Sequence, residues 1–140
     1  LGARLLVDAL VGRPPLSELA RFGGQTPEFG PGGAVAVRGV PWQRYHGKIK
    51  TIGNVELRAI VLRTPFLGRP AALGVLGFVD LGRVWSDWRP NPALDGLDWG
   101  LKLGLGGGIR LHWGETFIVR GDVAWSPDGV GVTFDVNHIF

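Results

Sequence analysis

The stretch "WGLKLGLGGGIRLHW", residues 99–113, alternates between large apolar residues and glycine or polar residues along its whole length. One parity is apolar apart from Gly107 and has a tryptophan at each end: Trp99, Leu101, Leu103, Leu105, Ile109, Leu111 and Trp113. The other parity is small or polar: Gly100, Lys102, Gly104, Gly106, Gly108, Arg110 and His112. A period of two indicates a β-strand with one face in an apolar medium and the other in a polar one.

The length of this stretch decides which apolar medium it faces. At ~3.4 Å per residue the stretch from Trp99 to Trp113 is about 48 Å long, and a tilt of about 45° reduces its height to roughly 34 Å. That height is close to the thickness of a bilayer, with an aromatic residue at each interface. A strand in a soluble domain is typically about five or six residues long. We therefore predict a strand that crosses a membrane.

The same period of two recurs along the chain and predicts six strands, separated by a long first loop at 12–48. The predicted strands cover about 3–11, 54–63, 73–86, 99–113, 116–126 and 130–140. After the first loop, short and long connections alternate, which is typical of outer-membrane barrels. Because the smallest such barrels have about eight strands and lipid tolerates no open sheet edge, we expect the rest of a longer chain, or further chains, to complete the wall.

Composition excludes several other classes of protein. The net charge of +3 is the excess of 15 basic residues, twelve arginines and three lysines, over 12 acidic residues. The basic residues are spread along the chain, whereas nucleic-acid binding usually gathers such charges on one face. No apolar run approaches the ~18 residues of a transmembrane helix. The 45% hydrophobic content and six tryptophans argue against disorder despite 24 glycines and 10 prolines. The chain is therefore predicted to be one all-β unit over residues 1–140, part of a transmembrane antiparallel β-barrel.

A set of short motifs resembles one family of such barrels. In chain order they are "ELARFGG" (18–24), "VRG" (37–39), "RYHGK" (44–48), "GNVELR" (53–58), "GFVDLGRVW" (77–85) and the C-terminal Phe140. Their order and spacing resemble the C-terminal part of the BamA/TamA outer-membrane assembly barrels, the bacterial surface antigen family. The resemblance covers nearly the whole chain. It implies a sixteen-stranded outer-membrane barrel that inserts or transports polypeptides, with lipid and client polypeptides as partners and no enzymatic activity.

The resemblance also implies that loop 12–48 folds back into the barrel, where Arg38 contacts acidic residues on neighbouring strands. The alternation independently places Glu56 and Asp80 on the inward face. A guanidinium held away from water needs carboxylates within reach of its fork of donors. We name the candidate site, Arg38 and Gly39 with Glu56 and Asp80, the loop lock. The same inward charges, together with Arg58, Arg120 and Asp122, are alternatively plain lining of a barrel interior.

Three further groups of residues are assigned roles. Relatives carry an aromatic residue where this chain has Val40, so we expect Trp42 or Tyr45 to replace it, with Arg44 packing beside them. Glycines inside a strand often let another backbone or ring approach, which gives a role to Gly104, Gly106 and Gly108. The C-terminal strand resembles the signal by which outer-membrane barrels are recognised through strand addition, with Phe134, Val136 and Phe140 as its residues.

The remaining candidates point to no chemistry. His46, His112 and His138 have no metal-ligand spacing, and the chain has no cysteine, so no metal or cofactor is expected. Ser126 near His138 lacks the context of a catalytic nucleophile. Two other functions remain open: a membrane anchor for a patatin-like lipase or other surface protein whose active domain lies upstream, and a structural or pore-forming barrel.

Overall fold

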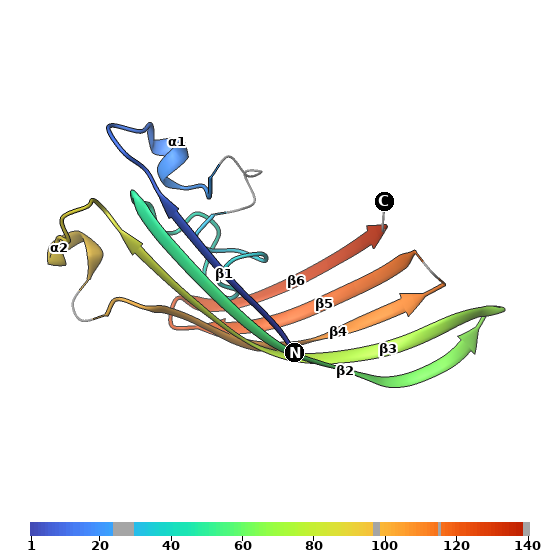
Figure 1. Cartoon of the computed structure of the whole chain (residues 1–140). Coiled ribbons are helices and arrows are strands. Elements are labelled where there is room, and N and C mark those ends of the chain that lie inside the picture. Colours follow the sequence, from blue (N-terminus) through green and yellow to red (C-terminus); the bar gives the residue numbers. More distant parts are fainter. Residues whose placement is uncertain (24–29, 97–98, 115, 139–140) are drawn as a thin grey trace.

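The computed structural model describes residues 1–140 except 24–29, 97–98, 115 and 139–140. One antiparallel sheet contains all six strands, and each strand pairs with its neighbours in the sequence. The strands are β1 (Gly2–Ala9), β2 (Ile49–Phe66), β3 (Arg69–Trp85), β4 (Lys102–Trp113), β5 (Phe117–Ser126) and β6 (Gly129–His138). Two short helices, α1 (Leu16–Leu19) and α2 (Pro92–Asp95), lie in the connections (Figure 1). The predicted all-β class is confirmed, and the sheet is open, with β1 and β6 at its edges.

The strand ends differ from the predicted ones at several places. β4 begins at Lys102 and not at Trp99, because Gly100 has a positive φ of 50° that interrupts the extended backbone. β2 and β3 extend through the predicted loop 64–70 and are joined by Leu67 and Gly68, with φ of 49° and 72°. Two positive φ values suit the tight turn of a β-hairpin. The end of the predicted last strand, 139–140, lies outside the described residues.

The two faces of the sheet differ in polarity as the alternation requires. Large apolar side chains of every strand stand exposed on the convex face, among them Leu5, Leu57, Val79, Leu105, Val123, Val132 and Phe134. The register sets Val79 opposite both Val55 and Leu105, so the apolar residues form continuous rows across the strands. The concave face carries the charged and small residues of the other parity. The sheet is therefore curved and two-faced, with an apolar convex side and a charged concave side.

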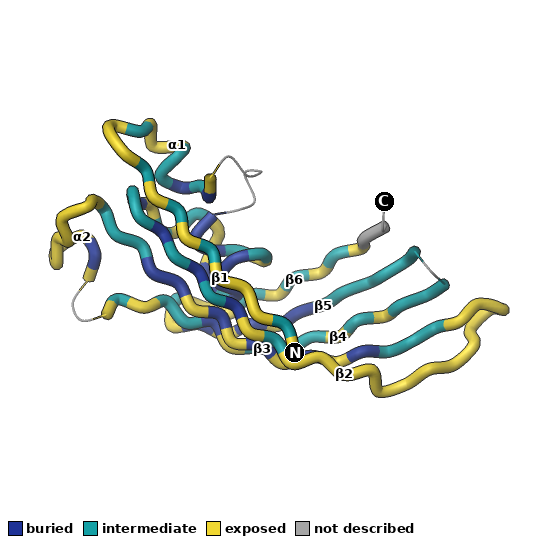
Figure 2. The backbone as a smooth tube through the Cα atoms, viewed as in Figure 1, coloured by how far each residue is buried: buried dark blue, intermediate teal, exposed yellow. Residues whose placement is uncertain are grey.

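The first loop, between β1 and β2, lies over the concave face near the end of the sheet that carries α1 and α2 (Figure 1). Its residues supply most of one buried apolar cluster, which contains Phe22, Ala36, Val37, Val40 and Ile52. A smaller cluster of Leu76, Phe78 and Ala124 belongs to the sheet itself. Burial is therefore concentrated where the loop covers the strands, while the far end of the β2–β3 hairpin is exposed (Figure 2). Neither helix in the described part of the chain is long and apolar enough to cross a membrane.

Candidate functional site

The loop segment Val37–Arg38–Gly39 crosses the concave face from β3 towards β6, and glycines mark its route. A Cβ atom at Gly82 of β3 would lie 2.6 Å from Cγ2 of Val37. A Cβ atom at Gly104 of β4 would overlap the carbonyl oxygen of Arg38. The loop backbone therefore rests directly on the strands, at a distance that only glycine permits.

Arg38 binds Asp80 of β3 with a two-pronged contact. Its Nε donates to Oδ2 at 2.7 Å, and its Nη2 donates to Oδ1 at 2.8 Å. The backbone N–H of Arg38 donates to the same Oδ2 at 3.1 Å. Asp80 has no exposed surface, and Arg38 is 7% exposed. Paired, hydrogen-bonded groups are the form in which a buried guanidinium and carboxylate are tolerated in a protein.

Neighbouring side chains complete the surroundings of Arg38. Its third nitrogen, Nη1, lies 2.7 Å from Oε1 of Glu56, and its guanidinium carbon lies 3.4 Å from the centre of the Phe78 ring. Asn54 donates to Oδ1 of Asp80 at 2.7 Å and to the carbonyl of Ala36 at 2.7 Å. Burial by itself would lower the pKa of Arg38, but the hydrogen bonds and charges of Asp80 and Glu56 outweigh it and raise the pKa. The arginine is therefore charged at every relevant pH.

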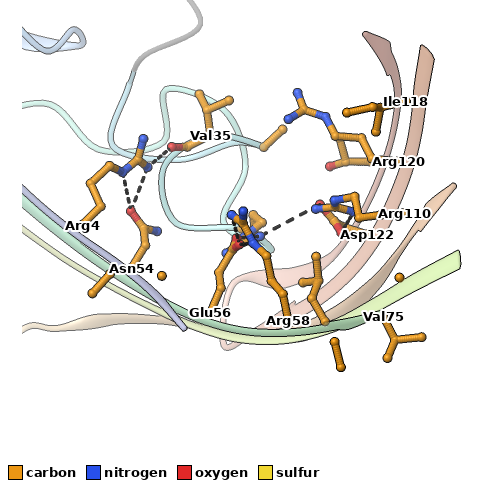
Figure 3. A pocket seen from close by; sticks show the side chains of 18 of the residues that line it. Arg4, Val35, Asn54, Glu56, Arg58, Val75, Arg110, Ile118, Arg120 and Asp122 are labelled. Carbon is orange, nitrogen blue, oxygen red and sulfur yellow. Dashed lines mark hydrogen bonds and ion pairs between the residues drawn. The ribbon is translucent and has the colours of Figure 1, made fainter. Parts of the chain in front are cut away.

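The charges continue along the concave face beyond the loop lock. Nη1 of Arg38 lies 3.9 Å from Asp122 of β5, and Asp122 in turn accepts two bonds from Arg110 of β4, at 2.6 and 2.9 Å (Figure 3). Arg58 pairs with Glu56, and Arg120 of β5 pairs with Asp135 of β6. The row balances four arginines against four carboxylates: Arg38, Arg58, Arg110 and Arg120 against Glu56, Asp80, Asp122 and Asp135.

From the sequence, Asp122 is predicted to be lining of the interior, and Asn54, Phe78 and Arg110 have no predicted role in the loop lock. The structure places all four close to the loop lock. Parity was the available signal for Asn54 and Phe78, because each stands two residues from a member of the lock on the same face of the same strand. Arg110 and Asp122 meet diagonally across β4 and β5, and that contact depends on a register that the sequence does not specify.

The two aromatic residues expected to pack the loop, Tyr45 and Trp42, differ in their exposure. Tyr45 is half-buried, and its hydroxyl donates to the carboxylate of Asp128, 2.7 Å from Oδ2. Trp42 is 55% exposed and lies beside Gly33 of the same loop, where an added Cβ atom would be 3.2 Å from Cδ1 of the indole, so of the two candidates Tyr45 is the one that points inward. Val40, which is 3% exposed, lies in the buried apolar cluster of the loop, and Gln43, next to Trp42, has a positive φ of 51°.

Arg44 and the three candidate glycines each contact different parts of the structure. The side chain of Arg44 is 55% exposed, and its Nε lies 3.8 Å from Asp128, so it packs at the surface of the loop. Of the glycines, only Gly104 faces the loop. A Cβ atom at Gly106 would overlap a carbonyl of β5 and lie 2.5 Å from the Phe78 ring, and one at Gly108 would overlap Asp122. Gly106 and Gly108 therefore make room for side chains that surround Arg38.

The proposed C-terminal signal residues lie on β6. Phe134 and Val136 point to the convex face and are 73% and 45% exposed. Phe140 lies outside the described residues.

A second buried charge fastens the first part of the loop, and the sequence analysis missed it. Lys50 of β2 has a fully buried side chain, and its Nζ lies 2.7 Å from Oδ2 of Asp8, its partner in the β1–β2 register. The same Nζ donates to the carbonyl of Glu18 in α1 at 3.1 Å and lies 5.8 Å from the centre of the Phe22 ring. Lysines are rarely fully buried unless paired. Lys50 therefore ties α1 to the first two strands.

Replacing Lys50 with methionine is expected to release α1 while leaving the loop lock in place. The change keeps the length and apolar stem of the side chain but removes the cation that pairs with Asp8 and the donor to the Glu18 carbonyl, at a cost of about 2 kcal/mol in docking of this segment. Limited proteolysis should show faster cleavage near residues 13–23 and unchanged cleavage near 36–40. Lys48→Met, which removes an exposed ion pair with Asp87, is the matched control. Equal protection of 13–23 in both variants would contradict the assignment.

Comparisons with known protein families, with curated proteins and with solved structures find no match for this chain.

Proposed function

We propose that this chain is the C-terminal part of a sixteen-stranded outer-membrane barrel belonging to a protein assembly or translocation factor of the BamA/TamA type. The barrel would insert or transport other polypeptides at the bacterial outer membrane. Its partners would be lipid on the convex face, the remaining strands at the sheet edges and client polypeptides at the seam. The proposal assigns no covalent chemistry to these residues.

Two properties of the sheet support the barrel. Its convex face is apolar on every strand while its concave face holds charges, which is the division expected of a wall between lipid and an aqueous interior. Its edge strands β1 and β6 have no outer partner among the residues that the structure describes. Unpaired backbone N–H and C=O groups cost several kcal/mol each in lipid, so further strands are needed to close the wall.

The observation that carries the functional proposal is the docked loop. A long loop folded onto the concave face, with a buried arginine that binds Asp80 and Glu56, matches what the sequence resemblance implies for assembly barrels. Every charged group around Arg38 is paired with an opposite charge. Such a set of mutual pairs holds a loop in place and leaves no side chain poised as a nucleophile or general base. These contacts therefore fit a loop that stabilises a transport or assembly barrel better than they fit the active site of an enzyme.

The test is a folding assay with a client. The protein, purified with all the chains that accompany it, is reconstituted into liposomes, and a urea-unfolded eight-stranded barrel protein is added. We expect the fraction of folded client, measured by heat-modifiable gel mobility, to rise at least several-fold faster than with liposomes that contain an unrelated porin. Equal rates would refute the assembly function. Steady ion conductance together with equal rates would point to a pore instead.

A further inference from the structure

We propose that the inward loop also positions the last strand, by fastening the start of β6 and leaving the remainder of β6 to separate independently. The fastening consists of Gly39 and Tyr45 from the loop and Ser126, Asp128 and Gly131 from the β5–β6 hairpin, which we call the hairpin clamp. Its relevance to transport rests on the proposed function, whereas the fastening itself rests on the contacts alone.

Polar contacts form one half of the hairpin clamp. The Tyr45 hydroxyl lies 2.7 and 2.9 Å from the two carboxylate oxygens of Asp128, in the turn between β5 and β6. The ammonium of Lys102 stands 4.2 Å from the centre of the Tyr45 ring and holds the ring from the β4 side. Ser126, which is 2% exposed, donates its hydroxyl to the carbonyl of Gly39 at 2.9 Å. The turn is thus bonded to the loop at two separate points.

Close backbone contact forms the other half. Gly39 has a φ of 88°, and a Cβ atom there would lie 3.0 Å from the carbonyl carbon of Trp125. A Cβ atom at Gly131 of β6 would lie 3.2 Å from the Cα of Gly39. With no side chain between them, the loop backbone rests on the first residues of β6 and on the last residues of β5.

Further along the same hairpin the loop and the strands separate. A cavity of about 700 Å³ lies there, lined by Ala34 and Val35 of the loop and by Ile118, Arg120 and Thr133 of the hairpin. Figure 3 shows Ile118 and Arg120 on the far side of this space from Val35. The inner face of β6 is therefore covered near Gly131 and open from Thr133 onward.

This asymmetry decides how β6 moves. Within the described part of the chain this edge strand pairs only with β5, so its second half is held by the β5 ladder and by the partly exposed Arg120–Asp135 pair. Exposed ion pairs contribute little to stability. The first half is held in addition by the hairpin clamp. Separation of β6 from its neighbours should begin at the 134–138 end and stop at Gly131, so that a client strand would enter from that end.

Hydrogen–deuterium exchange of the purified assembly in detergent tests the inference. Tyr45→Phe keeps the ring but removes the bonds to Asp128. A hydrogen bond to a charged group contributes enough to change a local opening equilibrium about tenfold. We therefore expect amides of residues 128–131 to exchange about tenfold faster in the variant than in the wild type, and those of 134–138 to change by less than about twofold. Ser126→Ala, which removes the Gly39 contact, should act in the same direction.

Lys48→Ala is the matched control, because it removes an exposed loop contact with Asp87 that lies outside the hairpin clamp. It should leave exchange in 128–131 unchanged. An unchanged rate in Tyr45→Phe, or an equal rise along the whole of β6, would overturn the inference. The client-folding assay is independent of this result: a barrel that fails to fold clients but shows the exchange pattern would refute the proposed function and retain the hairpin clamp.

Discussion

Arg38→Ala is expected to release the inward loop and lower the temperature at which the protein unfolds. Asp80 has no exposed surface and receives three of its hydrogen bonds from Arg38; the two from the guanidinium would be lost. Removing one partner of a buried ion pair typically costs about 3–5 kcal/mol, because the remaining charge stays buried without compensation. In the proposed membrane barrel, insertion should persist, since the apolar convex face is unchanged. Protease resistance of residues 30–48 and heat-modifiable gel mobility measure the two effects.

Two further variants distinguish the effect of breaking the loop lock from the effect of simply removing a charge. Arg58→Ala removes an arginine from the same concave face, but one whose side chain is 66% exposed, and its effect should stay within about 1 kcal/mol. The double variant Arg38→Ala with Asp80→Ala should cost less than the sum of the two single variants, because it leaves no unpaired charge. Normal gel mobility together with normal protease resistance in Arg38→Ala would show that the loop is held by other contacts.

Gly104→Ala is expected to displace the loop without removing any of its interaction partners. The added methyl group would overlap the carbonyl oxygen of Arg38, and both partners of that clash are backbone. Forcing atoms into a packed site costs typically about 1–3 kcal/mol, and here we expect the upper end because neither backbone moves without breaking its ladder or the Arg38–Asp80 bonds. Residues 36–40 should become accessible to protease, and the unfolding temperature should fall.

The matched control is Gly77→Ala on the neighbouring strand. That glycine faces the convex side, and the nearest atom to a new Cβ is 4.0 Å away. Its effect on the free energy of unfolding should stay within about 0.5 kcal/mol. Equal protease resistance of Gly104→Ala and Gly77→Ala would mean that the loop does not rest on β4.

The sequence predicts the elements that alternation controls and misses those that depend on register or on loop conformation. Six strands follow from a period of two that repeats on both faces, and the same parity puts Glu56 and Asp80 on the concave side with Arg38. The true start of β4 depends on one positive φ at Gly100, which no periodicity indicates.

Within the site, the side-chain roles that the sequence misses likewise depend on strand register or on loop conformation. The burial of Lys50 requires Asp8 directly opposite, which only the β1–β2 register reveals. Tyr45 and Trp42 are both aromatic residues of one loop, and only the folded conformation of that loop shows that Tyr45 is the more buried of the two. Neither the burial of Tyr45 nor the exposure of Trp42 is a property of its own residue type.

The contacts of the loop also determine when, during synthesis and folding, the loop reaches its final position. Tyr45 reaches Asp128 across 83 residues, and Ser126 reaches Gly39 across 87. Contacts between residues so distant in sequence form late, since the intervening chain must first be made and closed into a loop. The loop therefore cannot take its final place until the last hairpin exists. A chain truncated before residue 126 would keep Asp80 and Glu56 but lack the partners of Tyr45 and Gly39, so complete seating of the loop requires that the β5–β6 hairpin has been made.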